Sequence, residues 1–310
     1  MAIVVIGAVF VDVKGYPEDL YLPTGRNAGS VEIVHGGVGR NVAEDIANVE
    51  LRPRFVSIVD DTANGAEVLR KLGKHKVNTD YVLASPDGMG VWLAVFDNTG
   101  DLAGSISKRP DLSPLIGLLD EKGDEIFRDA DSIVLEIDME HDIVKRILRY
   151  AEKYGKKVYA VVSNMTIASQ RRDFLQSIDC FVCNVQEAGI LFVDDFSGME
   201  PEALTEELYG RIVKANIPAM VVTLGSRGAV YAGMDGERGY CPPESVIVRD
   251  TSGAGDAFCA GVVIGQTYGK TLRESVRIGT HLAASVITVS ESTCPRFLPK
   301  ELGLDIDVPE

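Results

Sequence analysis

Arg249-Asp-Thr-Ser-Gly-Ala-Gly-Asp-Ala-Phe-Cys-Ala260 is the stretch that decides the fold. It follows a β-branched run, Val246 to Val248, which predicts a strand, and it leads into an apolar pattern with helical spacing. Glycines between a strand and a helix allow a tight turn and bring backbone N–H groups close to a ligand. These N–H groups and the helix dipole then favour phosphate oxygens. The stretch therefore predicts an α/β protein with an anion site at the start of this helix.

Asp256 places a carboxylate in the first turn of the predicted helix, where an anion would bind. In one interpretation it is an ordinary capping residue, because negative side chains are stable near a helix N-terminus. In the other it is a general base that takes the proton of an attacking hydroxyl while the glycine turn holds a phosphoryl group. The stretch alone leaves both interpretations open.

The composition is that of an acidic, soluble protein. The 310 residues include 31 Lys and Arg against 46 Asp and Glu, a formal net charge of −15. This charge repels nucleic acid and anionic membranes, so neither is an expected partner. The chain begins with strand-like residues instead of a basic signal-peptide region, and no apolar run approaches the length of a membrane span. We therefore expect a cytoplasmic protein.

The five cysteines are scattered along the chain, which fits reduced thiols. Cys180 and Cys183 form a CxxC motif within a predicted strand, where residues three apart face opposite sides. We therefore expect no metal or redox role for this pair.

Strand and helix patterns alternate along the chain, as in a mostly parallel sheet covered by helices. The predicted strands include Arg54–Val59 and Ala219–Thr223, and the segment Tyr16–Ser30 is predicted to be a loop. The exception runs from Gly90 to Ser107, where two strand patterns flank the turn Asp97-Asn-Thr-Gly100 and predict an antiparallel hairpin. We expect one α/β domain over residues 1–310, with lid segments at approximately 13–35 and 89–109. No G-x-G-x-x-G motif follows the first strand, and no Walker A motif is present, so a dinucleotide-binding or P-loop fold is excluded.

Two N-terminal features predict a ligand site. Asp12 lies among valines, and it belongs either to a turn before Lys14 or to a site for sugar hydroxyls at the carboxyl end of a strand. Gly36-Gly-Val-Gly39 precedes a helical pattern that starts near Asn41. Asn at a helix entry is often only a cap, but the paired glycines suggest close approach to a bound molecule.

Four motifs in this order resemble those of the ribokinase-like (phosphofructokinase-B type) carbohydrate kinase family. They are Gly36-Gly-Val-Gly-Arg-Asn41, Asn184-x-x-Glu187, Thr223-x-Gly225-x-x-Gly228 and Asp250-Thr-Ser-Gly-Ala-Gly-Asp-Ala-Phe258. The resemblance covers nearly the whole chain. It implies a ribokinase-like α/β fold, with a mostly parallel central sheet flanked by helices and a small β-sheet lid. It also implies transfer of the γ-phosphate of ATP to a hydroxyl of a small ribosyl substrate.

The resemblance further implies a role for each motif. Asp256 is the expected catalytic base, beside an anion hole formed by the backbone of Gly253, Ala254 and Gly255. The substrate is expected to bind Asp12, Gly36, Gly37, Asn41 and Glu136, with Asp138 as the alternative to Glu136. The nucleotide is expected to bind Asn184, Thr223, Gly225, Ser226 and Gly228. Glu187 is expected to hold Mg²⁺ through water, and Asp250 and the Ser252 carbonyl are expected to bind K⁺.

Within the family, the chain is most similar to pseudouridine kinases. The similarity rests on Val11-Asp-Val-Lys-Gly15, on the Gly-Gly-Val-Gly-Arg-Asn form of the first motif and on the Asp97–Gly100 turn. The chain departs from those kinases at Ser163-Asn-Met-Thr166 and at Ser107-Lys-Arg-Pro110. The alternatives are a kinase for ribose, fructose, uridine or adenosine and, from another class, a ligand-binding regulatory protein. Alternating apolar residues in the hairpin also leave an edge that could pair with a second copy, giving a homodimer through the lid.

Overall fold

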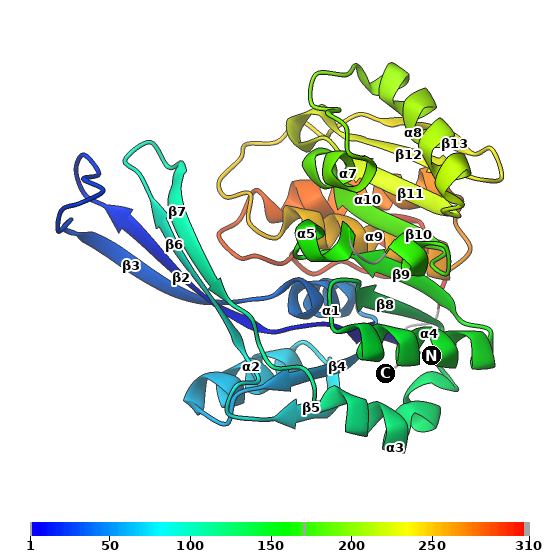
Figure 1. Ribbon diagram of the computed structural model, residues 1–310, viewed down its shortest axis with the longest axis horizontal. Coiled ribbons are helices and arrows are strands. Elements are labelled where there is room, and N and C mark those ends of the chain that lie inside the picture. The colour runs from blue at the N-terminus through cyan, green and yellow to red at the C-terminus, as the bar shows by residue number, and fades with distance from the viewer. Residues whose placement is uncertain (1, 170–171, 307–310) are drawn as a thin grey trace.

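The computed structural model describes residues 2–169 and 172–306, which form two β-sheets (Figure 1). The larger sheet has nine strands in the order β13-β12-β11-β10-β9-β8-β1-β4-β5. Its strands are β1 (Ile3–Ile6), β4 (Arg54–Val59), β5 (Asn78–Ala84), β8 (Ser132–Glu136), β9 (Lys157–Val161), β10 (Cys180–Asn184), β11 (Ala219–Thr223), β12 (Ala229–Gly233) and β13 (Arg238–Cys241). Strands β5 to β11 along this order pair in parallel, while β12 and β13 are antiparallel.

Helices cover both faces of the large sheet, which explains why its strands are continuous apolar runs (Figure 1). One face packs against α3 (Leu115–Phe127), α4 (His141–Tyr154), α7 (Val185–Phe192) and α8 (Pro201–Ala215). The other packs against α1 (Val38–Asn48), α2 (Ala63–Lys74), α9 (Ala254–Thr267) and α10 (Leu272–Val286). The short helices α5 (Met165–Ala168) and α6 (Arg172–Leu175) lie between β9 and β10. Two hydrophobic cores therefore hold the sheet between two helical layers.

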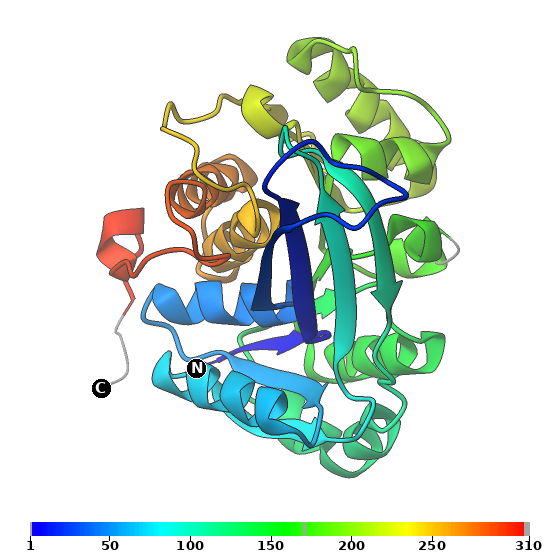
Figure 2. The same cartoon turned by 90° about the vertical axis from the view of Figure 1, so that its left-hand side faces the viewer.

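The small sheet has four strands in the order β3-β2-β6-β7. They are β2 (Phe10–Pro17), β3 (Gly29–Gly36), β6 (Gly90–Phe96) and β7 (Leu102–Lys108). The sheet extends away from the rest of the molecule as an arm, and Figure 2 shows it from that side, in front of the helical body (Figures 1 and 2). Because β6 and β7 pair antiparallel, the predicted hairpin is confirmed.

The order in which the chain adds strands to the large sheet reverses at β1, which lies between β4 and β8. After β1 the chain moves outward through β4 and β5, and it then returns to β8 and proceeds through β9, β10 and β11. Such a reversal leaves a crevice at the carboxyl ends of β1 and β8, the usual ligand position in open α/β sheets. The small sheet is inserted beside this crevice, because β2 and β3 lie between β1 and α1 in the chain.

Two local predictions need correction, and one helix was not predicted. The strand predicted at Val246–Val248 is wrong: these residues form no strand, and Ile247 is 91% exposed. They follow Pro242 and Pro243, which lack the N–H groups needed for sheet pairing. The segment Tyr16–Ser30, predicted to be a loop, contributes its ends to β2 and β3, and α3 was not predicted.

The cysteine prediction is confirmed in its geometry. Cys180 packs in the core on the α9 side of the sheet and Cys183 in the core on the α7 side. Both thiols are free and buried. Within residues 2–169 and 172–306, no helix combines the length and the apolar character that a membrane crossing requires.

Candidate active site

The glycine turn before α9 is built so that only glycine fits its first position. Gly253 has φ of 78°, and a Cβ there would lie 1.9 Å from the carbonyl oxygen of Ser292. Gly253 is also the N-cap of α9, and glycine has no side chain that could accept the first N–H groups of the helix. A Cβ on Gly255, in contrast, would meet no atom within 4 Å. The start of α9 thus keeps backbone donors and open space for a ligand.

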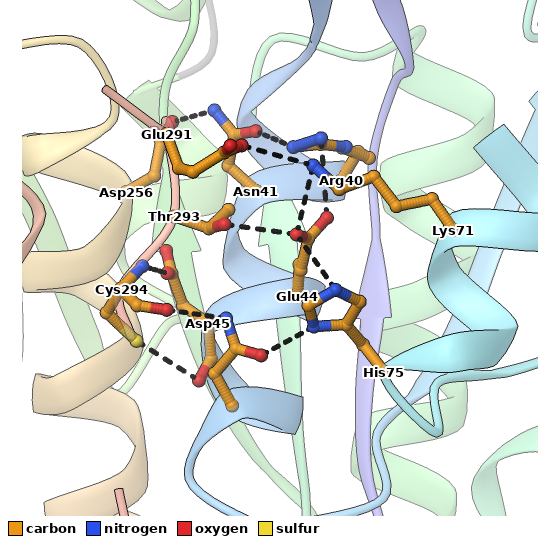
Figure 3. Close-up of polar contacts among 11 residues, drawn as sticks. Arg40, Asn41, Glu44, Asp45, Lys71, His75, Asp256, Glu291, Thr293 and Cys294 are labelled. Carbon is orange, nitrogen blue, oxygen red and sulfur yellow. Dashed lines mark hydrogen bonds and ion pairs between the residues drawn. The ribbon is translucent and has the colours of Figure 1, made fainter. Parts of the chain in front are cut away.

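Asp256 is the third residue of α9, but its carboxylate contacts another helix. Oδ2 accepts a 2.6 Å hydrogen bond from Nδ2 of Asn41, in the first turn of α1 (Figure 3). The structure therefore does not support the capping interpretation. Burial raises the pKa of Asp256 to about 7, opposed by the Asn41 hydrogen bond and the Arg40 charge. A carboxylate with such a pKa can take up and release a proton near neutral pH.

The start of α1 brings a second carboxylate to the same place. Asp12 lies within β2, so the turn interpretation is wrong. A Cβ on Gly36 would lie 2.3 Å from Asp12 Oδ2, which means that the carboxylate rests against the bare glycine backbone. Gly37 has φ of 102° and begins α1 as its N-cap. Burial raises the pKa of Asp12, while the positive charges of Lys14 and Arg40 oppose the rise.

Lys14 is a site residue that sequence reasoning missed. Its Nζ donates a 3.1 Å hydrogen bond to the hydroxyl of Ser252, although the two residues are 238 positions apart. The side chain is almost fully buried, and it joins the small sheet to the loop that precedes the glycine turn. In that loop, Asp250 Oδ1 accepts a hydrogen bond from the backbone N–H of Ser252. The local signal was a lysine placed two residues after Asp12 on the same face of a strand.

Glu136, predicted to line the substrate site, is engaged by the backbone. Oε1 accepts a 3.2 Å hydrogen bond from the N–H of Ala8 and a shorter one from the N–H of Gly39. The side chain is 3% exposed, and burial together with the nearby Asp138 raises its pKa to about 8. The Glu136 carboxyl group thus links the residues after β1 to the start of α1.

Asp138, the alternative to Glu136, joins the two segments in which the chain departs from pseudouridine kinases. Its carboxylate accepts hydrogen bonds from the N–H and the hydroxyl of Ser163, at 3.0 and 2.8 Å. The Arg109 guanidinium, just after β7, lies 3.5 Å from the same carboxylate and donates a 2.9 Å bond to the Asp138 carbonyl. Arg109 therefore links the exit of the small sheet to the carboxyl end of β8.

The predicted nucleotide motifs lie at the ends of β10 and β11. Asn184 pairs in register with Thr223, so the two motifs are neighbours at the carboxyl ends of two adjacent strands. Asn184 and Glu187 form a reciprocal capping box at the start of α7, with hydrogen bonds of 2.9 and 2.7 Å. After β11, Gly225 and Ser226 form a 3-10 turn with Arg227, and Gly228 has φ of 83°.

Burial and the charge of Asp138 raise the pKa of Glu187. Its capping bond uses Oε2, and the carboxylate has a second oxygen available to a hydrated cation. Among residues 2–169 and 172–306, no three His, Cys, Asp or Glu side chains converge on one metal position. The donor set therefore fits a Mg²⁺ ion held mainly by water and substrate phosphates, with one protein carboxylate nearby.

Comparison with known proteins agrees with this geometry. Residues 2–297 match the pfkB family carbohydrate kinases. The chain belongs to this family. A guanosine-inosine kinase of Exiguobacterium acetylicum is 33% identical and a pseudouridine kinase of Escherichia coli is 25% identical. The alignments cover 94% of this chain in both cases, and 95% and 92% of those proteins.

The fold of this pfkB kinase is also that of solved ribokinases. Arabidopsis thaliana ribokinase, solved with ribose and ATP, superposes with a TM-score of 0.82 at 22% identity, covering 97% of this chain and 99% of that one. The expectation of a ribokinase-like fold is therefore confirmed. The expected enzyme class is confirmed as well: the protein is a sugar or nucleoside kinase, a phosphotransferase with a hydroxyl acceptor.

Proposed function

We propose that the protein uses ATP to phosphorylate the 5′-hydroxyl of a ribonucleoside. The observation that carries this proposal is the position of Asp256 in the first turn of α9. Its carboxylate is held toward Asn41, beside a helix start whose N-cap is a bare glycine. This combination offers a proton acceptor and an anion site next to each other, as phosphoryl transfer to a hydroxyl requires.

In the proposed reaction, Asp12, Asn41 and the backbone of Gly36 and Gly37 hold the ribosyl hydroxyls and orient the substrate. Asp256 accepts the proton of the attacking hydroxyl. The backbone of residues 253–255 would then stabilise the negative charge on the transferred group, as N–H donors at a helix start do for a developing anion. Lys14, which already contacts Ser252, adds a positive charge on the side of the small sheet.

The second substrate is expected at the ends of β10 and β11. We propose that Asn184, Thr223, Gly225, Ser226 and Gly228 bind ATP. Glu187 would hold hydrated Mg²⁺, which supplies charge neutralisation at the phosphates. Asp250 and the Ser252 carbonyl are the candidate ligands of K⁺.

Guanosine and inosine are the first candidate substrates, because the guanosine-inosine kinase has the higher identity to this chain of the two nucleoside kinases compared. Arg109 is the candidate base contact, through N–H groups that its bonds to Asp138 do not use. A guanidinium can donate two hydrogen bonds to the O6 and N7 acceptors that guanine and hypoxanthine share, whereas adenine carries a donor in place of O6. Pseudouridine is the second candidate, favoured by the relative at 25% identity and by the Val11–Gly15 segment.

The test is an ADP-release assay with ATP, Mg²⁺ and K⁺ across guanosine, inosine, pseudouridine, adenosine, uridine, ribose and fructose. We expect kcat/KM for a nucleoside to exceed that for ribose by at least about tenfold, one bidentate contact being worth roughly 1–3 kcal/mol. A preference for ribose or fructose would instead make the protein a sugar kinase. No turnover with any acceptor would favour the ligand-binding alternative.

The small sheet is proposed to act as a lid and as a dimer surface. Its outward face carries the cross-strand row Ile33, Val13, Leu93 and Ile106. Three of these side chains are exposed, at 65% for Ile33, 42% for Leu93 and 71% for Ile106. Such an apolar row fits the same face of a second copy. Light scattering should give the mass of a dimer, and Leu93→Glu should give a monomer; a monomeric parent protein would contradict the proposal.

A further inference from the structure

The motif residue between Gly39 and Asn41 is a charged side chain buried in the protein. Arg40 is 1% exposed, although a guanidinium is costly to remove from water unless it is paired. Its Nη1 donates a 2.6 Å hydrogen bond to Oδ1 of Asn41, and its Nη2 lies 3.3 Å from Oε2 of Glu44 (Figure 3). A buried arginine with these two partners is held in a fixed position.

Glu44 is itself anchored from two other parts of the chain. Its Oε1 accepts a 3.0 Å hydrogen bond from Thr293, in the segment after α10. The same oxygen lies 3.4 Å from Lys71 Nζ and 3.7 Å from His75 Nε2, both from the end of α2 (Figure 3). The Arg40–Glu44 pair is therefore supported by α2 and the C-terminal segment, away from the substrate crevice.

On the crevice side, Arg40 and Asp256 together fix the orientation of the Asn41 amide. A guanidinium has donors only, so it must meet the amide oxygen. With Oδ1 turned to Arg40, Nδ2 is turned to Asp256, where it donates the 2.6 Å bond to Oδ2. Without Arg40 the amide oxygen loses its partner, and the bond to Asp256 is then left to hold the amide in this orientation.

We infer that Arg40 is a positioning residue for the proposed reaction: through Asn41 it fixes the orientation of the Asp256 carboxylate and keeps it ionised for proton removal. The inference rests on the proposed role of Asp256 as the base.

Several groups act on the pKa of Asp256, and Arg40 is the positive charge among those that favour ionisation. The Arg40 charge and the Asn41 hydrogen bond lower the pKa of Asp256, while burial and the charges of Asp12 and Glu187 raise it. The other titratable groups coupled to this carboxyl are Asp45 on α1, Glu136 on β8 and Cys259 on α9. Removing Arg40 leaves all the groups that favour protonation in place. The pKa of Asp256 should therefore rise further above 7.

The test compares Arg40→Gln and Arg40→Lys with Lys71→Gln as the matched control. Lys71 also contacts Glu44, but its other ion pair is with Glu291, whereas Arg40 bonds directly to Asn41. We expect Arg40→Gln to move the acidic limb of kcat/KM to higher pH by about one unit, so that activity at pH 7 falls about fivefold and largely recovers at pH 8.5. Arg40→Lys should keep the limb close to that of the parent protein but lower kcat, because an ammonium cannot present two fixed donors. Lys71→Gln should keep both the limb and kcat.

A readout without turnover separates this inference from the substrate proposal. In protein labelled with ¹³C at the aspartate carboxyl carbons, the signal lost in Asp256→Asn reports the Asp256 titration. The midpoint of this titration should move to higher pH in Arg40→Gln, whatever the substrate is. If Arg40→Gln does not fold, Arg40→Gln/Glu44→Gln removes both charges of the buried pair and should give a smaller shift in the same direction. Folded Arg40 variants with the parent titration and the parent pH profile would overturn the inference and leave Arg40 a purely structural residue.

Discussion

Helices α9 and α7 each have a carboxylate in the first turn, but the two carboxylates bind different partners. Asp256 is the third residue of α9, and Glu187 is the third residue of α7. Glu187 folds back onto the N-cap N–H of its own helix, in a box completed by Asn184. Asp256 instead reaches Asn41 on α1. The N-cap residue makes the difference: Asn184 offers a reciprocal acceptor, whereas Gly253 has no side chain.

The comparison shows that a carboxylate in the first helical turn is not by itself a cap or a base. The role depends on whether the N-cap side chain uses the local N–H groups, and on what the neighbouring helix offers. At α7 the helix start is satisfied internally. At α9 no N-cap side chain accepts the first backbone N–H groups, although the Ala254 N–H donates to the Thr251 carbonyl, and the Asp256 carboxylate binds a partner on another helix. The predictions below test this distinction.

The largest effect is expected for Asp256→Asn. Turnover should fall by at least about a hundredfold, because a general base typically contributes 10²–10⁴-fold, while ATP binding should remain. Steady-state ADP release measures the first and calorimetric titration with ATP the second. Glu274→Gln is the matched control, since Glu274 is also a third-residue carboxylate, in the capping box of α10. Near-parent turnover of Asp256→Asn would remove the distinction between the two helix starts.

Gly253→Ala should show why the α9 N-cap has no side chain. A Cβ at φ of 78° is strained, and here it would also meet the Ser292 carbonyl at 1.9 Å. We expect a loss of at least about 2 kcal/mol in the free energy of unfolding. Gly255→Ala is the control: it lies in the same turn, its Cβ would meet no atom within 4 Å, and it should unfold like the parent. Equal stability of the two variants in urea denaturation would contradict this account.

The pH dependence of activity and of stability should show that the pKa of Asp256 is higher than that of an exposed carboxylate. Its pKa of about 7 means that the base is protonated below neutrality, so kcat/KM should fall about tenfold per unit below pH 7. The stability of the fold changes with pH in the opposite direction to the activity. The folded protein keeps this proton to a higher pH than the unfolded chain, so the contribution of Asp256 to stability decreases as pH rises from about 4 to 7. The Tm of Asp256→Asn relative to the parent should therefore increase over that range; a constant difference would argue against the raised pKa.

Glu187→Gln should separate the helix-capping role of Glu187 from its proposed role in Mg²⁺ binding. Glutamine at this position can still complete a capping box, so stability should stay within about 0.5 kcal/mol of the parent. The lost charge should raise the Mg²⁺ concentration for half-maximal rate several-fold, because Mg²⁺ prefers carboxylate oxygens. A Mg²⁺ titration at fixed ATP measures this change. An unchanged titration would leave Glu187 with the cap alone.

Much of the fold could be predicted because buried parallel strands are continuous apolar runs with sharp ends. The range predicted for β11, Ala219–Thr223, is the range found, and so is that for β4. Helix α3 was missed because Leu115–Phe127 mixes apolar residues with glycines and several charges. Val246–Val248 has the composition of a strand, but Pro242 and Pro243 before it disfavour sheet pairing, which composition alone does not reveal.

The candidate site was predictable in its list of residues but not in its contacts. The motifs identified Asp12, Asn41 and Asp256 individually. Whether Asp256 capped its own helix depended on Asn41, 215 residues away. Lys14 and Arg109 could not be placed in the site for the same reason, since each is defined by a partner on another element. Sequence spacing determines local geometry, whereas long-range partners follow from packing.

The smallest expected effect is that of Asn184→Ala, the complement of the Gly253 experiment. Alanine removes the acceptor of the 2.9 Å bond from the Glu187 N–H, so α7 should lose about 1 kcal/mol of stability. Glu187 would then have no reciprocal partner, and its carboxylate would be less firmly held. Urea denaturation of Asn184→Ala beside Asn184→Ser, which keeps a capping oxygen, measures the cap. If the alanine variant is as stable as the serine variant, the box contributes nothing, and the contrast between α7 and α9 lies in the ligand each helix start binds.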